Sequence, residues 1–474
     1  MTTLPPPIQK TFQERKNIEK HHIELKTIHN NYYIYQATST WNTQTKKPTK
    51  KTTLLGTITK DGTYKPKQPK KREQSTATYY EYANSQLCQT LQQDIKQNLP
   101  NIKYKDELIA LSITKAIDPI PLYLTQSRYN KLYISKTQKT NLTSRHLTDV
   151  LTEIGNNPKI YDLYHQLAQT GGILFYDLTS ILTHSKNLKL AEKGYNAKHS
   201  NKNQINIILA FSTTTKLPIA TDVFYGSIKD IKTIRHFLDR FACQDMGFIF
   251  DRGFSSYKLL LELKAGKVHY IVPLKKNSTL LPEVFVAQGA FIYRKRSVGF
   301  SKQVCSYGFL YLFLDPSIRS EREHVLLSRV AEGELSVGEY ELLRRRAGVF
   351  GLVSDLDCSA EEVYGRYKDR EEVELAFDVL KNELDADRTY LQSEAAVRGY
   401  FVVVLLALRL RFKILLRLRE CGLVGEVSVR EVLFELSKIE LSVEESGREV
   451  FCAFPKRAKE ILDVFSDFIP MDPS

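Results

Sequence analysis

The chain has 474 residues, of which 42% are hydrophobic and 26% charged. This composition excludes wholesale disorder, collagen and disulfide-rich miniproteins, and the length predicts roughly two to four domains. Lys and Arg total 68 against 54 Asp and Glu, a formal net charge of +14. Such an excess favours a polyanionic partner, with nucleic acid first and an anionic membrane surface second.

Neither the cysteines nor the N-terminus predicts a secreted or membrane protein. The six cysteines are isolated and include no C-x-x-C pair, which argues against a zinc knuckle or a redox motif and suits a reducing compartment. Residues 1–16 lack the apolar core of a signal peptide, and the apolar run at 400–408 stops at Arg409, well short of a membrane span. We therefore expect a cytoplasmic protein with no membrane partner.

Residues 1–73 predict a basic N-terminal segment. Two strand-like runs, 31–37 and 52–58, are separated by a charged stretch and predict a small β-hairpin. The cationic residues 65–72 are interrupted by proline, so they predict a linker rather than a helix interior.

Residues 74–170 predict a helical region, to which we assign DNA binding. Within it, residues 143–154 have an N-cap and an apolar stripe. A recognition helix would fit this pattern, but packing inside the helical region fits it better.

From residue 171 the pattern changes to alternating strands and helices. Three apolar, β-branched runs joined by polar turns predict a meander: residues 173–177, 204–213 and 217–225. The alternation then continues with a helix at 230–242, a strand at 248–250, a helix at 256–264 and a strand at 269–274. Residues 171–275 are therefore the first part of a predicted α/β core.

Residues 276–346 interrupt the core with short alternating runs, which predict a β-rich insertion. The second part of the core spans 347–420 and contains a long helix, because Ser359 and Glu362 have the form of a capping box; this helix should run to about residue 384. A helical region at 421–474 follows. The order of elements predicts an α/β fold with a mixed sheet flanked by helices.

Two aspartates end predicted strands of this core. Asp177 ends ILFYD and Asp251 ends GFIFD, and the carboxyl ends of sheet strands are where α/β proteins usually place their sites. A turn or N-cap role explains a strand-terminal Asp equally simply and is more common. From these residues alone both interpretations stay open.

The helix beginning near Ser359 carries four polar side chains at helical spacing. With about 100° per residue, Tyr367, Arg370, Glu374 and Lys381 fall on a stripe about 60° wide beside an apolar face. Such an edge suits a site that handles anions and metal ions. A surface helix with i,i+4 charge pairs is the alternative, of equal weight.

The spacing Tyr367-x2-Arg370-x3-Glu374-x6-Lys381 matches the Y-x2-R-x3-E-x6-K signature of DDE transposases of the insertion-sequence-four superfamily. The tripeptide Lys193-Gly194-Tyr195 before the strand at 204–213 resembles the branch typified by mycoplasma-element transposases. The resemblance covers roughly residues 171–418.

The resemblance implies an RNase H-like core with a β-rich insertion between Asp251 and Glu374. It implies that Asp177, Asp251 and Glu374 are the catalytic carboxylates and bind two Mg²⁺ ions, for which Mn²⁺ can substitute. Oxygen ligands suit such hard cations, and a metal pair can activate a nucleophile and stabilise the leaving 3′-oxygen. The resemblance also implies that Tyr367, Arg370 and Lys381 contact DNA.

The expected function is a transposase that binds the terminal inverted repeats of an insertion sequence in double-stranded DNA. It would cleave and transfer the strands by cut-and-paste transposition, as a homodimer at the prokaryotic nucleoid. An inactivated DNA-binding relative or an RNase H-like nuclease are the alternatives. Some relatives steady a flipped base on a tryptophan of the insertion. The single Trp41 lies outside it, and a Phe or Tyr of the insertion, for instance Phe291 or Tyr293, could substitute.

Overall fold

The computed structural model describes residues 4–28, 31–42, 47–67, 77–168, 172–185, 187–194, 202–227, 230–241, 246–254 and 256–471. The chain divides into two compact units, Met1–Ala77 and Thr78–Ser474. Each unit is described by itself. Tyr195, part of the tripeptide at 193–195, lies outside the described residues.

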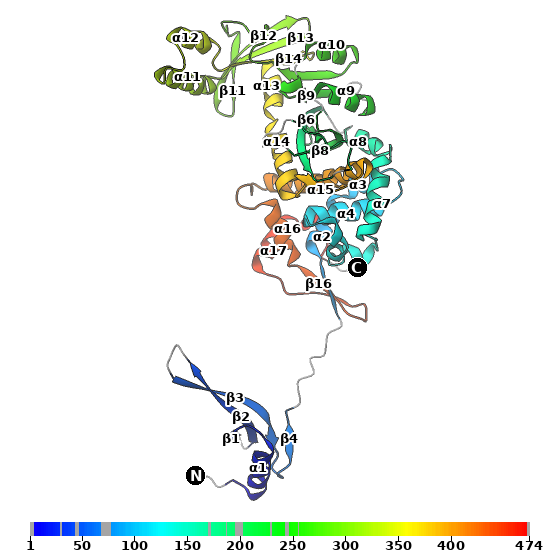
Figure 1. Ribbon diagram of the computed structural model, residues 1–474, viewed down its shortest axis with the longest axis vertical. Helices are drawn as coiled ribbons and strands as arrows, with labels where there is room; N and C mark the ends of the chain where they lie inside the picture. Colours follow the sequence, from blue (N-terminus) through cyan, green and yellow to red (C-terminus); the bar gives the residue numbers. More distant parts are fainter. Residues whose placement is uncertain are drawn as a thin grey trace. The chain divides into compact units, whose positions relative to one another are not determined.

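The first unit is a four-stranded antiparallel sheet with one helix (Figure 1). The elements are α1 (Pro6–Ile18), β1 (Ile23–Ile28), β2 (Asn31–Asn42), β3 (Lys47–Ile58) and β4 (Tyr64–Pro66), with the strands in the order β1-β2-β3-β4. Ile8 of α1 packs against Ile23, Ile34 and Ile58, which are all buried. The predicted hairpin is therefore confirmed, but its strands are longer. The charged residues 47–51 form part of β3, because cross-strand pairing satisfies their backbone despite the weak apolar signal.

The second unit begins with the predicted helical region. Its elements are β5 (Thr78–Glu81), α2 (Ala83–Leu91), α3 (Gln93–Asn98), α4 (Lys105–Ile117), α5 (Thr125–Tyr129), α6 (Ile134–Thr137), α7 (Ser144–Asn156) and α8 (Ile160–Ala168). The stripe of α7 predicted from the sequence is buried, namely Leu147, Val150, Leu151 and Ile154. These side chains face other helices, so α7 is a packing helix.

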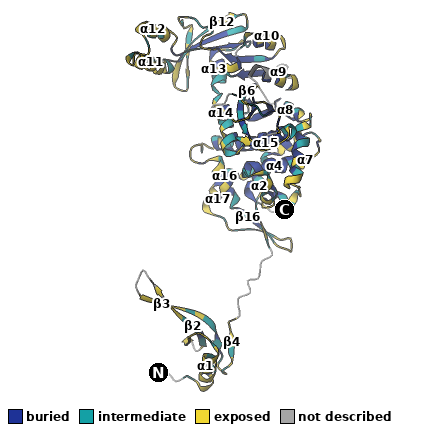
Figure 2. Cartoon of the chain, in the orientation of Figure 1, coloured by how far each residue is buried: buried dark blue, intermediate teal, exposed yellow. Residues whose placement is uncertain are grey.

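Helix α15 (Glu394–Glu420) is the centre of this helical layer (Figure 2). Its crossing with α7 is close: a Cβ on Gly399 would lie 2.0 Å from the carbonyl oxygen of Leu151, so only glycine fits there. Two buried arginines interrupt its apolar run. Arg411 pairs with Glu383 at 2.5 Å, and Arg409 donates to the Pro218 carbonyl at 3.0 Å.

Of the helices within the described residues, none is by itself long and apolar enough to cross a membrane. The bent pair Lys105–Ile117 and Leu122–Tyr129 passes that test together, by length and composition only.

A ten-stranded mixed sheet forms the core of the second unit. Its central strands are β6 (Ile173–Thr183), β7 (Gln204–Ser212), β8 (Pro218–Tyr225), β9 (Gly247–Phe250), β10 (His269–Pro273) and β14 (Val349–Ser354). They lie in the order β8-β7-β6-β9-β10-β14; β6, β9 and β10 are parallel, and the other pairs are antiparallel. Helix α9 (Asp230–Phe241) leads from β8 to β9, and helix α10 (Tyr257–Ala265) connects the parallel strands β9 and β10. The predicted mixed α/β sheet is confirmed.

The predicted insertion is only partly β-rich. Strands β11 (Gly289–Tyr293), β12 (Arg296–Cys305) and β13 (Gly308–Leu314) extend the core sheet, because β13 pairs with β14. Helices α11 (Pro316–Ala331) and α12 (Val337–Arg345) follow, and the strand-rich prediction is wrong for them. Their start signals are present in the sequence: Asp315 caps α11, and Ser336 forms a capping box with Glu339.

The long helix predicted from Ser359 begins as expected and then breaks. Ser359 and Glu362 form the capping box of α13 (Ala360–Lys368), while α14 (Glu371–Asp378) starts only after Asp369 and Arg370. A π-helical turn, Val379–Glu383, follows α14. Both side chains at the break bind residues outside the helix, Asp369 binding Lys216 and Arg370 binding Asp251.

The C-terminal region contains strands as well as the predicted helices. Its elements are α16 (Val429–Ser437), β16 (Glu440–Val443), β17 (Glu449–Phe451) and α17 (Lys456–Val464). Strand β16 pairs with both β5 and β17, so residues from the two ends of this unit share a small sheet.

Candidate active site

Asp177 and Asp251 lie side by side on neighbouring parallel strands. The last registered pair of β6 and β9 is Tyr176 with Phe250, so each aspartate is the next residue on its strand. Adjacent strands are about 4.8 Å apart, so the two carboxylates lie close together where β9 ends beside β6. Strand β6 continues to Thr183, so the prediction that Asp177 ends its strand is wrong; β9 is the strand that ends there.

A layer of aromatic rings fixes the backbone beneath this pair. Tyr176 and Phe250 are fully buried, and the Tyr176 ring packs edge-on against Phe250 and Phe254 at 5.6 and 5.4 Å. The single turn Arg252–Phe254 carries the chain away from the sheet, where the Phe254 amide donates to the Asp251 carbonyl. This packing leaves little freedom for the strand ends that carry the two carboxylates.

Arg370 brings Glu374 to the two aspartates. Its Nη1 lies 2.5 Å from Asp251 Oδ1, its Nη2 3.9 Å from Asp177 Oδ2, and its Nε 3.4 Å from Glu374 Oε1. One guanidinium therefore contacts all three predicted carboxylates. Figure 1 shows α14, which carries Glu374, beside β6.

The three carboxylates differ in exposure. The Asp177 side chain is 18% exposed, that of Asp251 34% and that of Glu374 63%. Asp177 is thus held in the wall of the site, where its Oδ1 accepts from the Leu178 amide at 2.8 Å. Glu374 is free to change rotamer because most of its side chain is in solvent.

Burial and crowding raise the pKa of Asp177 to about 6, with burial the largest cause and the charges of Asp251 and Glu374 adding to it. The Arg370 guanidinium and the Leu178 amide act in the opposite direction. Burial alone would lower the pKa of Arg370, but the surrounding carboxylates, Asp251 first, raise it overall. The site therefore has one firmly charged cation and an excess of acid groups.

Tyr367 and Lys381 occupy different surroundings. Tyr367 is half-buried next to Arg370, with its ring against Phe350 at 6.2 Å, and burial raises the pKa of its phenol. Lys381 is half-buried in the π-helical turn. The stripe was calculated for one ideal helix, whereas the helix breaks at Asp369 and Lys381 lies in a π-helical turn, so a spacing of 100° per residue does not hold over the whole segment.

The donor set fits a divalent cation in its chemistry. Carboxylate oxygens are the ligands that Mg²⁺ and Mn²⁺ prefer, and these three surround a single positive charge. Within the described part of the chain, no group of three or more His, Cys, Asp or Glu side chains is spaced to hold a metal ion as it stands. Arg370 therefore lies where a cation shared by these acids would bind.

Two further features near the site were not predicted. Lys216, in the turn between β7 and β8, has a left-handed φ of 54° and binds Asp369 Oδ2 at 2.6 Å. Its sequence, a polar turn between two predicted strands, indicated the turn but not the partner. Arg252, directly after Asp251, acts electrostatically on Tyr367.

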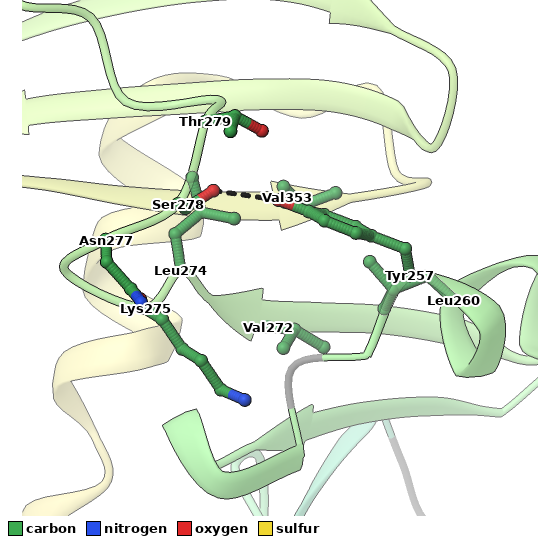
Figure 3. Close-up of a pocket in the computed structure, with 9 residues that line it drawn as sticks. All are labelled: Tyr257, Leu260, Val272, Leu274, Lys275, Asn277, Ser278, Thr279 and Val353. Atoms are coloured by element: carbon green, nitrogen blue, oxygen red, sulfur yellow. Dashed lines mark hydrogen bonds between the residues drawn. The ribbon is translucent and has the colours of Figure 1, made fainter.

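A cavity of about 240 Å³ opens beyond the end of β10, on the same edge of the sheet (Figure 3). Tyr257 lies across it and forms a hydrogen bond of 2.8 Å with Ser278, and Lys275 and Asn277 are among its other lining residues.

The aromatic residues considered for base stacking are half-buried and pack against the core. The rings of Phe291 and Tyr293 lie 5.3 and 5.0 Å from that of Tyr364, which is itself buried. Both residues therefore connect the insertion strands to α13.

Comparison with known proteins identifies the family. The family described as "Transposase DDE domain" matches residues 168–410, more than half of the chain. No curated protein matches. The solved "Cryo-EM structure of piggyBac transposase synaptic complex with hairpin DNA" is 14% identical, with 83% of this chain and 84% of that chain covered at a TM-score of 0.35, too low to support an argument about function. The family match spans all three carboxylates, and the chain belongs to the transposases with a DDE domain.

Proposed function

We propose that this DNA transposase binds the terminal inverted repeats of an insertion sequence and performs metal-dependent strand cleavage and strand transfer in cut-and-paste transposition. The single observation that carries the proposal is the contact of one guanidinium, Arg370, with Asp177, Asp251 and Glu374. A relative that only binds DNA has no use for three mutually repelling carboxylates around one cation.

An RNase H-like core is part of the proposal. Strands β8, β7 and β6 form an antiparallel meander, and β9 and β10 continue the sheet in parallel with β6. The two aspartates lie on the middle strand β6 and directly after its parallel neighbour β9. This arrangement supports the assignment, together with the family match.

Asp177, Asp251 and Glu374 would hold the two Mg²⁺ ions, or Mn²⁺ in their place. Bound divalent ions supply an activated water or 3′-hydroxyl and neutralise the leaving 3′-oxygen. The chain itself provides the positions: the aromatic layer fixes the aspartates, and the exposed Glu374 can rotate towards them. Arg370 balances part of the acid charge. Divalent ions held by the three carboxylates would share this role and would leave the guanidinium able to bind a phosphate.

DNA contacts are proposed for Tyr367, Arg370 and Lys381. An arginine can bind a phosphate through two parallel hydrogen bonds, and a lysine acts as a point charge. A homodimer is proposed because transposition must bring two ends of the element together.

The test compares Glu374→Gln with Glu371→Gln on a plasmid that carries the reading frame and its flanking DNA, with Mg²⁺ or Mn²⁺. Both glutamates lie on α14 with side chains 63% exposed, but Glu371 pairs with Arg294. We expect the first variant to lose at least about 100-fold in cleavage rate while it still binds the DNA, and the second to cleave normally. Undiminished cleavage by Glu374→Gln excludes the proposed mechanism.

A further inference from the structure

The positive charge of this protein is concentrated in its first unit. Residues 1–77 contain 15 Lys and Arg against 5 Asp and Glu, a net charge of +10 out of +14 for the chain. Residues 78–168, the greater part of the region 74–170 to which DNA binding was assigned from the sequence, contain 10 against 8. The excess that predicted a polyanionic partner therefore belongs to a unit outside the family match at 168–410.

One face of the first sheet is open. Helix α1 covers the face that carries Ile23, Ile34 and Ile58. On the other face, Lys26, Tyr33, Thr57 and Lys65 are successive cross-strand partners across all four strands. Cross-strand partners point to the same side of a sheet, so these residues form a row with a lysine at each end.

A second aromatic ring adjoins this row. Tyr35 is two residues from Tyr33 on β2 and therefore on the same face. The Lys26 Nζ lies over its ring, 4.8 Å from the centroid. The open face thus combines half-buried tyrosines with exposed lysines, without the apolar surface that a protein core requires.

Strands β2 and β3 continue beyond this sheet as a two-stranded ribbon (Figure 1). Strand β1 pairs with β2 only as far as Gln36, and β4 pairs with β3 only from Gly56, whereas β2 and β3 pair on to Asn42 and Lys47. Residues 43–46 lie outside the described residues and play no part in the inference.

The ribbon carries cations and one exposed aromatic ring. Lys47, Lys50 and Lys51 are exposed, and Trp41 is 65% exposed. Trp41 and Lys50 continue the open face, since Trp41 lies six residues after Tyr35 and Lys50 pairs with Ser39. Lys50 also forms an ion pair with Glu24, which lies on the same face.

We propose that this surface, formed by the open face (Lys26, Tyr33, Tyr35, Lys65) and the ribbon (Trp41, Lys47, Lys50, Lys51), binds double-stranded DNA. The inference rests on the proposed function, since it assigns the DNA-end contacts of that function to the first unit. A two-stranded ribbon fits the major groove of B-DNA, and lysines on both sides of it reach the flanking phosphates. The charge of the unit is complementary to the duplex, whereas the near-neutral region 78–168 is not.

The sole tryptophan provides a direct measurement on the full-length protein. Trp41 is the only Trp in the chain, so its fluorescence reports on the ribbon alone. We expect a duplex from the DNA flanking the reading frame, added in EDTA to prevent cleavage, to change its emission. Vesicles of anionic phospholipid should leave it unchanged. An emission that responds to vesicles and not to the duplex overturns the inference, as does a clear preference for single-stranded DNA.

Charge variants test the lysines. In fluorescence anisotropy with the same duplex, we expect the triple variant Lys47→Gln, Lys50→Gln, Lys51→Gln to bind at least about tenfold more weakly at low salt, and the slope of log affinity against log salt to fall by about 2 to 3. The matched control is Lys10→Gln, Lys16→Gln, Lys20→Gln, which removes three exposed lysines on or next to α1, away from the open face. The control should bind within about threefold of the wild type.

The outcomes separate this inference from the proposed function. If the wild type binds and cleaves DNA but the ribbon variant binds as tightly and Trp41 does not respond, the ribbon inference fails and the transposase stands. If Trp41 responds to the duplex and the ribbon variant loses binding, yet the wild type cleaves nothing with either metal, the transposase proposal fails and the DNA-binding surface stands.

Discussion

Two clusters of the second unit, one around Arg370 and one around Asp222, bring aspartate, arginine and tyrosine side chains together in different proportions. Around Arg370, three carboxylates share one guanidinium at an edge open to solvent. Around Asp222, the proportions are reversed: one carboxylate, only 3% exposed, accepts from Tyr161 at 3.0 Å and from Arg240 at 3.3 Å.

The two clusters differ in charge balance, and this distinguishes a binding site from a structural contact. Asp222 is satisfied by donors from α8 and α9 and by the Val223 amide, so its charge is balanced within the fold. The three carboxylates around Arg370 share one positive charge, and burial raises the pKa of Asp177 to about 6. A cluster with excess negative charge can bind a further cation, whereas a cluster with balanced charge does not attract one.

Among the substitutions that test this comparison, Asp251→Asn is expected to have the largest effect on cleavage. Because Asp251 is the closest partner of Arg370 and a proposed metal ligand, we expect at least about a 100-fold loss of plasmid cleavage. The melting temperature should stay within a few degrees of the wild type, since Asp177 and Glu374 still balance the arginine. Asp239→Asn on the exposed side of α9 is the control. A variant that cleaves normally, or that simply unfolds, contradicts the distinction between the clusters.

At the structural cluster, Asp222→Ala should lower the free energy of unfolding by about 3 kcal/mol, because it leaves the Tyr161 hydroxyl and Arg240 without their acceptor. Chemical denaturation followed by circular dichroism measures the loss. The cleavage rate of the protein that remains folded should match the wild type. A large loss of cleavage without a loss of stability would assign Asp222 to the reaction instead.

Much of the site was predictable because local patterns encode it. Hydrophobic runs placed the strands before Asp177 and Asp251, and the capping box at Ser359 placed the start of α13. The meeting of the two aspartates follows from the register of the parallel pair, in which Tyr176 lies opposite Phe250, although β6 continues beyond Asp177. The family signature then related Glu374 to both.

The remaining features depend on partners far away in the sequence. Nothing local indicates that Asp369 binds Lys216, so the break between α13 and α14 was not predicted. Tyr161, Asp222 and Arg240 come from three elements, and each alone resembles an ordinary surface residue. Helices α11 and α12 were missed for another reason: their caps were present, but the short apolar runs suggested strands.

A smaller effect is expected from Asp177→Asn in metal-free buffer. The pKa of Asp177 is about 6 in the folded state, above the unfolded value of 3.8. The contribution of the protonated Asp177 to stability is therefore fully present below the unfolded pKa and is lost as the pH rises through the folded pKa. The variant has no carboxyl group at this position to ionise, so it does not lose this stability as the pH rises. We expect its gain in stability over the wild type to be greater near pH 8 than near pH 5 by about 1 kcal/mol. Equal gains at the two pH values would show that Asp177 titrates normally in the folded state.

The smallest effect is expected for Lys216→Gln. In the Lys216–Asp369 ion pair, the lysine side chain is 27% exposed and the aspartate side chain 33% exposed, so solvent screens the pair. Its loss should therefore change the free energy of unfolding by at most about 1 kcal/mol. Asp369 is, however, the residue before Arg370 at the helix break, and releasing it should loosen the position of the guanidinium. We therefore expect cleavage to fall several-fold while DNA binding stays unchanged. Lys216→Arg, which keeps the charge, should restore most of the rate; failure of this rescue would mean that the pair only supports the turn between β7 and β8.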